Sequence, residues 1–160
     1  MNHDTYPDDY IRAILRECRT IAMVGASANW NRPSYFAMKY LQEKGYRIIP
    51  VNPSAAGQEI LGEKVYAALS EIPVKVDMVD CFRPAEAIPP IAAAAIAIGA
   101  RVLWMQLGIR NDEAAAMAEA AGLKVVMNRC PKIEYGRLSG EIGWMGVNTR
   151  VISSKRLKKV

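Results

Sequence analysis

Residues 20–34 read TIAMVGASANWNRPS, and this stretch decides the fold class because its character changes sharply at Gly25. Residues 20–24 are a short continuous apolar run, which is typical of a strand buried on both faces of a sheet. Gly25 allows a tight turn, and Pro33 suits the first turn of a helix. The stretch therefore predicts a strand, a loop and a helix in that order, which is the repeating unit of parallel α/β sheets.

The same alternation of apolar runs and helical patterns continues on both sides of this stretch. Further strands are predicted at residues 46–51, 76–82, 101–108 and 123–128, with one short strand near Ile60. Helical segments are predicted at residues 8–17, 33–45, 67–73 and 111–122, and within the alanine-rich segment 83–100 near Pro89 and Pro90. Because right-handed crossovers connect such strands, we predict a three-layer α/β fold with a doubly wound, mostly parallel Rossmann-like sheet of about five strands.

The composition indicates one globular domain, because 160 residues with 51% hydrophobic content suffice for one core and are too few for two. The net charge of +5 comes from the end of the chain, where residues 150–160 contain five bases and no acid. The rest of the chain has 16 bases and 16 acids. We therefore expect a domain at residues 1–140 and a basic, solvated C-terminal tail at residues 141–160, with neither nucleic acid nor a membrane as partner.

Several other classes of protein are not expected. No apolar run is long enough to span a membrane, and the polar start does not resemble a signal peptide, so we expect a cytoplasmic protein. Three widely spaced cysteines without a CxxC pair indicate neither disulfides nor a metal site. The single histidine, His3, is expected in a frayed terminus, and Asp77 and Asp80 fall on opposite faces of one strand. No catalytic residue is predicted, and enzymatic activity is not expected.

In a doubly wound sheet a ligand binds beyond the carboxyl ends of the strands, so the residues after each strand are the candidates. After the first strand, Gly25 permits close approach of the backbone, and the helix that begins near Pro33 presents unpaired N–H groups to an anion. Ser27, Asn29 and Arg32 add hydrogen-bond donors. The alternative is an ordinary connection between a strand and a helix, because the loop lacks the second and third glycines of the GxGxxG fingerprint.

Two familiar nucleotide sites do not fit this sequence well. An NAD site normally has an acid at the end of the second strand, where this chain has Asn52. An asparagine can also contact a ribose, so an NAD(H)-binding module or a small oxidoreductase remains the alternative function. A Walker P-loop is not predicted, because the sequence GK[ST] does not occur.

Five motifs in a fixed order carry a resemblance to a known family: VGAS at 24–27, PVNP at 50–53, FRP at 82–84, LWMQLGI at 103–109 and NRCP at 128–131. Over residues 9–138 the chain resembles the small stand-alone CoA-binding proteins, which are similar to the N-terminal domain of the succinyl-CoA synthetase α subunit. The resemblance implies a Rossmann-like domain that binds coenzyme A or an acyl-CoA through its phosphorylated ADP portion. The chain ends before the domain that carries the synthetase phosphohistidine, so a non-catalytic or regulatory role is expected.

The resemblance also implies roles for residues that follow the first three strands: a phosphate turn, an NP loop and a segment that lies along the ligand. Together with the donors above, the predicted CoA-binding residues are Gly25, Ala26, Ser27, Asn29, Arg32, Asn52, Pro53, Cys81, Phe82 and Arg83. The family's closing loop is matched by Asn128, Cys130 and Pro131. Ala55 or Ala56 replaces the synthetase lysine of the NP loop, so Arg32 and Arg83 are the candidates to neutralise a phosphate.

Two further interpretations stay open. Cys81 and Cys130 lie at the ends of predicted strands, so they are either small buried residues or thiols that exchange with the thiol of CoA. Trp144 and Met145 lie in a glycine-rich segment, from which they would dock on the body of the domain, on a second subunit of a homodimer or on another protein.

Overall fold

The computed structural model describes the backbone of residues 1–148 and the side chains of residues 1–140. The basic cluster at residues 150–159 lies outside the described residues, and so do the side chains of Trp144 and Met145. The expectations that depend on them, a solvated tail and a homodimer or partner contact, therefore remain predictions.

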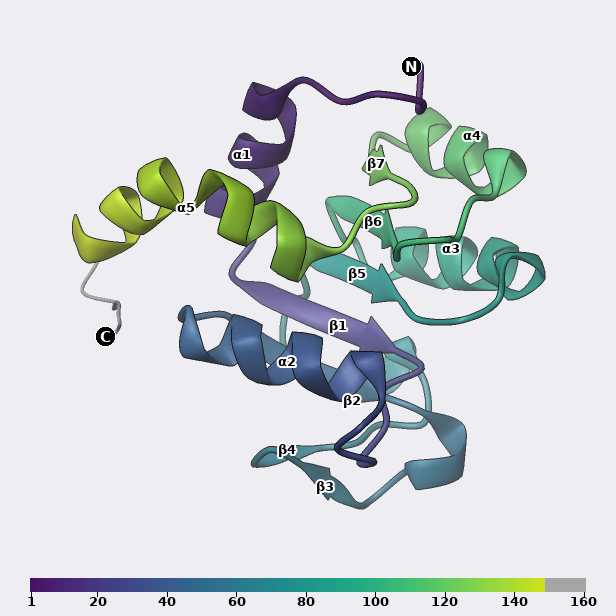
Figure 1. Ribbon diagram of the computed structural model, residues 1–160. Coiled ribbons are helices and arrows are strands. Elements are labelled where there is room, and N and C mark those ends of the chain that lie inside the picture. The colour runs from purple at the N-terminus through teal and green to yellow at the C-terminus, as the bar shows by residue number, and fades with distance from the viewer. Residues whose placement is uncertain (149–160) are drawn as a thin grey trace.

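The centre of the molecule is a parallel five-stranded sheet with the strand order β2-β1-β5-β6-β7 (Figure 1). A separate antiparallel pair, β3 and β4, lies beyond the β2 edge. The fold class predicted from the sequence is confirmed. The strands are β1 (Thr20–Val24), β2 (Arg47–Val51), β3 (Glu59–Ile60), β4 (Glu63–Lys64), β5 (Met78–Cys81), β6 (Val102–Met105) and β7 (Lys124–Val126).

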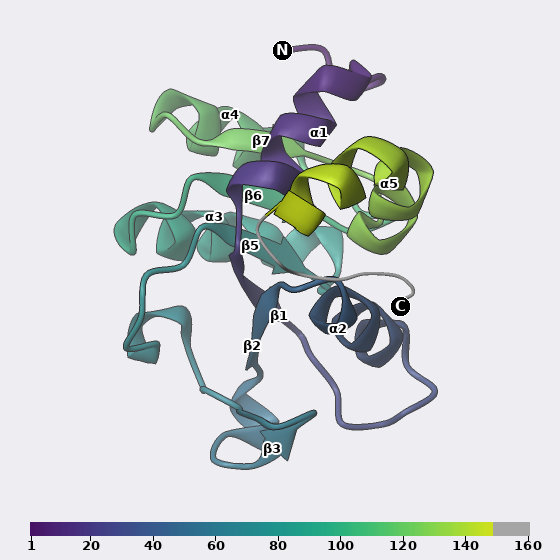
Figure 2. The same ribbon diagram turned by 90° about the vertical axis from the view of Figure 1, so that its left-hand side faces the viewer.

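Helices cover both faces of this sheet, as the view along its edge shows (Figure 2). One face is covered by α1 (Asp8–Glu17), α2 (Pro33–Glu43) and α5 (Pro131–Asn148). The other is covered by α3 (Ile88–Ala97) and α4 (Asp112–Ala120). Three short 3₁₀ turns follow strands or precede α3: η1 (Pro53–Ala55), η2 (Leu69–Glu71) and η3 (Ala85–Ala87).

The strands are mostly apolar because they are buried on both faces, and Asp80 on β5 is a buried exception. Met23, Met78 and Trp104 belong to the core under α1, α2 and α5. Val79 and Leu103, their neighbours in the same strands, belong to the core under α3 and α4. This two-sided burial explains why β1 and β6 read as continuous apolar runs rather than as an alternating pattern.

Local signals in the sequence set several element boundaries. Pro89 and Pro90 lie in the first turn of α3, where a missing N–H costs no helical hydrogen bond. Asn111 caps α4, and its Oδ1 accepts a hydrogen bond of 2.8 Å from the N–H of Ala114. The short strand expected near Ile60 is β3, and β4 pairs with it.

Two parts of the structure differ from the sequence-based expectations. Residues 131–148 form α5, which the glycines in this segment did not indicate, and the helix passes through the expected domain boundary at residue 140. Tyr135 and Leu138 are buried in the core, and α5 packs against α1 and α2, so tertiary contacts stabilise a helix that its propensity does not favour. The domain boundary stays a prediction.

The expectation of a frayed N-terminus at His3 is wrong. His3 is only 8% exposed, because its ring packs beside Tyr6 and its Nε2 lies 3.3 Å from a carboxylate oxygen of Glu119. This position is next to α4, to which Glu119 belongs. Among the helices of residues 1–148, none combines the length and the apolar character that a membrane crossing needs.

Candidate functional site

The winding of the sheet reverses between the neighbouring strands β1 and β5. The chain leaves β1 toward α2 on one face and leaves β5 toward α3 on the other. In open α/β sheets, the carboxyl ends of strands at such a switch point form the ligand crevice. The structure thus brings the loop after Val24 and the loop after Cys81 side by side, as the sequence predicts.

Gly25 is the point where these two loops approach most closely. Its N–H donates to Val51 O at 2.9 Å, and the N–H of Phe82 donates to Val24 O at 2.8 Å. Gly25 has a φ of +91°, and a Cβ at this position would lie 2.5 Å from Phe82 O. A glycine is therefore required here because any side chain would collide with the backbone that follows β5. This reason differs from the close approach of a ligand that the sequence suggested.

Asn52 ties the loop after β2 to the loop after β1. Its Nδ2 donates to Ala26 O at 2.9 Å, while its Oδ1 accepts from the N–H and the Oγ of Ser54 at 3.0 and 2.8 Å. Nearby, the N–H of Ser27 donates to Oγ of the buried Ser34 at 3.1 Å. Both polar ends of the Asn52 side chain are thus hydrogen-bonded within the protein, and they connect the loop after β2 to the loop after β1.

A polar cavity of about 360 Å³ lies at the N-terminus of α2. It is lined by Gly25, Ser27, Arg32 and Ser34 from the first loop and helix, by Asn52, and by Phe82 and Arg83. The first turn of a helix presents unpaired N–H groups and the positive end of its dipole. The polar cavity therefore has the features of an anion site.

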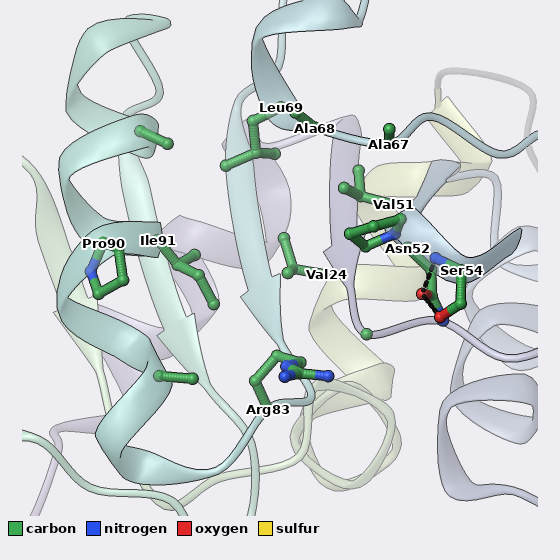
Figure 3. Close-up of a pocket in the computed structure, with 14 residues that line it drawn as sticks. Val24, Val51, Asn52, Ser54, Ala67, Ala68, Leu69, Arg83, Pro90 and Ile91 are labelled. Carbon is green, nitrogen blue, oxygen red and sulfur yellow. Dashed lines mark hydrogen bonds between the residues drawn. The ribbon is translucent and has the colours of Figure 1, made fainter. Parts of the chain in front are cut away.

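An apolar groove of about 480 Å³ adjoins the polar cavity, with which it shares Gly25, Asn52 and Arg83. Figure 3 shows Arg83 at one end of this groove, Leu69 of η2 at the other, and Ile91 of α3 facing Asn52 across it. Val24 and Val51, at the ends of β1 and β2, form its floor. The groove suits a flat apolar group that is attached to an anion.

A third cavity, also about 480 Å³, has only Arg83 in common with the lining of the groove. It shares Pro33, Phe82 and Arg83 with the polar cavity. We name it the Cys130 cavity, after the residue that directly precedes α5. Its remaining lining is formed by Pro84, Gln106, Leu107, Ile109, Cys130 and Ile133. The three cavities form a row along the carboxyl edge of the sheet.

The lining of this row is positively charged. Arg83 lines all three cavities and Arg32 lines the polar one, whereas no aspartate or glutamate lines any of them. Neither arginine forms an ion pair with a described side chain. Other exposed arginines behave differently: Arg47 pairs with Glu63, and Arg137 pairs with Asp8. The row of cavities therefore offers two uncompensated cations to a ligand.

Most of the predicted site residues come together, but three do not line these cavities. Ala26 is buried in the core, and only its carbonyl contributes, through Asn52. Asn29 is exposed, and its Oδ1 accepts from the N–H of Asn31 within its own loop. Cys81 is fully buried, and burial raises the pKa of its thiol well above the usual range. A reactive Cys81 at the ligand is therefore not what the structure shows.

The sequence analysis missed several residues of the site. Leu69 and Ile91 come from η2 and α3, and only the crossing of these elements above the strand ends makes them part of the groove. Ser34 follows Pro33 in the first turn of a predicted helix, so its side chain was a detectable candidate for the anion loop. Gln106 directly follows β6, which is the same signal that identified Arg83 after β5. Among residues 1–140, no group of three or more potential metal ligands is found.

Comparison with known proteins places this geometry in context. The family described as "CoA binding domain" matches residues 19–136. An uncharacterised protein of Bacillus subtilis, YneT, is 38% identical over 125 residues, which are 78% of this chain and 91% of that protein. A hypothetical protein from Pyrococcus horikoshii with a solved structure has a TM-score of 0.82 and 41% identity, covering 88% of this chain and 97% of its own.

A larger enzyme subunit is also similar. The α subunit of an ADP-forming acetate–CoA ligase from Pyrococcus furiosus is 40% identical over 77 residues. These residues are 46% of this chain and only 17% of the ligase subunit.

Proposed function

Because the chain belongs to the CoA-binding domain family, we propose that it binds coenzyme A or an acyl-CoA in the row of cavities at the carboxyl edge of the sheet, without catalysing a reaction on it. The observation that carries this proposal is the pair of arginines without a neighbouring acid, Arg32 and Arg83. A ligand with several phosphates compensates these charges. Charge-assisted hydrogen bonds between guanidinium groups and phosphates are among the strongest available to a protein.

The order of the cavities supports CoA over a simple phosphate. CoA carries its phosphates between an adenosine at one end and a long arm with a thiol at the other. The polar cavity likewise lies between the apolar groove and the Cys130 cavity, and Arg83 borders all three. In this arrangement the phosphates contact Arg32, Arg83 and the first turn of α2, the adenine packs between Leu69 and Ile91, and the arm extends toward Gln106.

Calorimetric titration in a reducing buffer tests the proposal. We expect saturable binding of CoA and weaker binding of dephospho-CoA, which lacks the 3′-phosphate. Arg83→Ala removes a charge-assisted hydrogen bond, so the affinity for CoA should fall by about 1.5 to 3 kcal/mol, or about ten- to 150-fold. Arg47→Ala is the matched control, because it removes the same charge at the opposite edge of the sheet.

Two outcomes would contradict the proposal. If both arginine variants weaken binding equally, only the net charge matters and the row of cavities is not the site. If NADH binds tightly and displaces CoA, the chain is an NAD(H)-binding module instead. The structure gives no specific reason for that alternative, since the side chain of Asn52, at the position of the usual ribose-binding acid, is engaged by Ala26 and Ser54.

A further inference from the structure

We propose that Cys130 is a covalent attachment site for CoA, and that it forms a mixed disulfide by exchange with the disulfide of oxidised CoA. The proposal rests on the proposed function, because the CoA site supplies the docking of the nucleotide. It goes further in assigning one cysteine, one reaction and one class of co-reactant, a disulfide of CoA, to the Cys130 cavity.

The structure separates Cys130 from the other two cysteines of the chain. Cys18 and Cys81 are buried, with at most 1% of their surface exposed. Burial raises the pKa of Cys18 to about 12 and that of Cys81 well above the usual range, so neither forms a thiolate readily. Cys130 is partly exposed and lines a cavity. It alone among the three can meet a dissolved disulfide.

Gln106 provides an independent indication that the Cys130 cavity takes a ligand. It lines this cavity and is only 7% exposed, yet its Oε1 has no hydrogen-bond partner among the described residues. A buried amide oxygen without a donor carries a substantial energetic cost. The arm of CoA contains amide N–H groups, and one of them would complete the hydrogen bonding of Gln106.

The position of Cys130 relative to Arg83 makes the reaction selective. Arg83 lines both the polar cavity and the Cys130 cavity, so phosphates held at Arg83 place the arm of the same molecule in the cavity that contains the thiol. Holding two reactants together raises the rate of their reaction without any new chemical group. A small disulfide that lacks the nucleotide has no such advantage.

The exchange is balanced in atoms and electrons. The Cys130 thiolate attacks one sulfur of the CoA disulfide, a bond forms between Sγ and that sulfur, and the bond between the two CoA sulfurs breaks. The leaving CoA thiolate takes up the proton that Cys130 gave up. Cys130 is oxidised to the mixed disulfide, one CoA is released as the free thiol, and a reducing thiol reverses the reaction.

Intact-mass spectrometry with two disulfides tests the proposal. The full chain is incubated with CoA disulfide or with pantethine, which has the same disulfide and arms but no nucleotide. We expect one CoA adduct per chain, mapped by peptide digestion to Cys130, that forms about ten-fold or more faster with CoA disulfide than with pantethine. Adenosine 3′,5′-bisphosphate should remove this advantage by occupying the nucleotide site, while the rate with pantethine stays the same.

Variants and a second measurement make the result decisive. Cys130→Ser should form no adduct. Cys18→Ala, which also removes one thiol, should react like the chain without a substitution. Peptide mapping of the chain without a substitution identifies the cysteine that carries the adduct, even if Cys130→Ser fails to fold. An adduct at another cysteine, no adduct, or equal rates with both disulfides would overturn the proposal.

Calorimetry in reducing buffer separates the two proposals. If CoA binds reversibly there but no selective adduct forms, the covalent inference fails and the CoA-binding function stands. If CoA does not bind and Cys130 reacts equally with both disulfides, both proposals fail.

Discussion

At the scale of single residues, Gly25 shows how one position serves the chain and the site together. Its positive φ turns the backbone at the end of β1, and its missing side chain makes room for the carbonyl of Phe82. The close approach of the two loops places Ser27 and Arg83 on the same cavity. The proposed phosphate site thus depends on a contact between two strand ends.

We predict that Gly25→Ala lowers the free energy of unfolding by more than Gly57→Ala does. Gly57 also has a positive φ, +87°, but a Cβ there meets no atom within 4 Å. Gly57→Ala therefore costs only the backbone strain, of the order of 1 to 3 kcal/mol, whereas Gly25→Ala adds the clash with Phe82 O. Urea denaturation of both variants measures the difference, and equal losses would show that the contact with Phe82 relaxes freely.

At the scale of elements, the edge strand β7 is protected by tyrosines from the start of the chain. The hydroxyl of Tyr10 donates to Val125 O at 2.9 Å and accepts from the N–H of Val125 at 3.0 Å, and the hydroxyl of Tyr6 accepts from the N–H of Met127 at 2.8 Å. Burial raises the pKa of Tyr10 to about 12, so its hydroxyl keeps its proton across the neutral range. The tyrosine hydroxyls thus pair with backbone groups of this edge that no neighbouring strand pairs with.

We predict that Tyr10→Phe destabilises the protein by about 1 to 3 kcal/mol, because the N–H and the carbonyl of Val125 both lose a partner. Tyr35→Phe is the matched control, since the hydroxyl of Tyr35 has no hydrogen bond to another described residue. Hydrogen exchange at the amide of Val125 should accelerate in Tyr10→Phe alone. An unchanged exchange rate would mean that the hydroxyl of Tyr10 does not protect this amide.

At the scale of the whole molecule, one carboxyl group in the middle of the sheet couples stability to pH. Asp80 lies on β5 between Met23 and Trp104, is fully buried, and neither of its carboxylate oxygens has a partner among the described residues. Burial raises its pKa well above the usual range. The folded chain therefore keeps this proton at a pH where the unfolded chain has lost it.

The sign of the pH dependence follows from this difference. Above the unfolded pKa of about 3.9, and up to the raised folded pKa, the unfolded state binds fewer protons than the folded state. The free energy of unfolding then falls as the pH rises, by at most about 1.4 kcal/mol per pH unit. Asp80→Asn resembles the protonated acid and removes this slope, so we predict that it is more stable than the unmodified chain at pH 7.5 and similar to it near pH 4.

Asp77→Asn is the matched control and should act in the opposite direction. Burial raises the pKa of Asp77, but hydrogen bonds from the N–H groups of Arg19 and Thr20 outweigh it, with help from Arg101, so the pKa is lowered. Asp77 thus stabilises the fold above its unfolded pKa, and this contribution is lost as the pH falls through the folded pKa. Urea denaturation at pH 4 and 7.5 tests Asp80→Asn, and at pH 7.5 Asp77→Asn should instead lower the free energy of unfolding. The assignment is contradicted if Asp80→Asn keeps the pH slope.

The sequence predicted more of the fold than of the site. Apolar runs predicted all five strands of the main sheet, since strands covered on both faces are apolar at most positions. The resemblance to CoA-binding domains is confirmed by the family match. The strand predicted at residues 101–108 extends past the end of β6, where Leu107 is again apolar. The helix α5 was missed because its stability comes from Tyr135 and Leu138 in the core rather than from its composition.

Sequence order alone determined that the candidate ligand-binding loops follow β1, β2 and β5, because a parallel sheet places the ends of its strands at one edge. It also identified Gly25 and Arg83 as residues of that edge. Only the tertiary structure decided what each residue does there. It buried Cys81, left Cys130 accessible, engaged Asn52 between two loops and brought Leu69 and Ile91 over the groove. Exposure, partners and cavities depend on which distant segments meet, and local sequence patterns contain no information about those contacts.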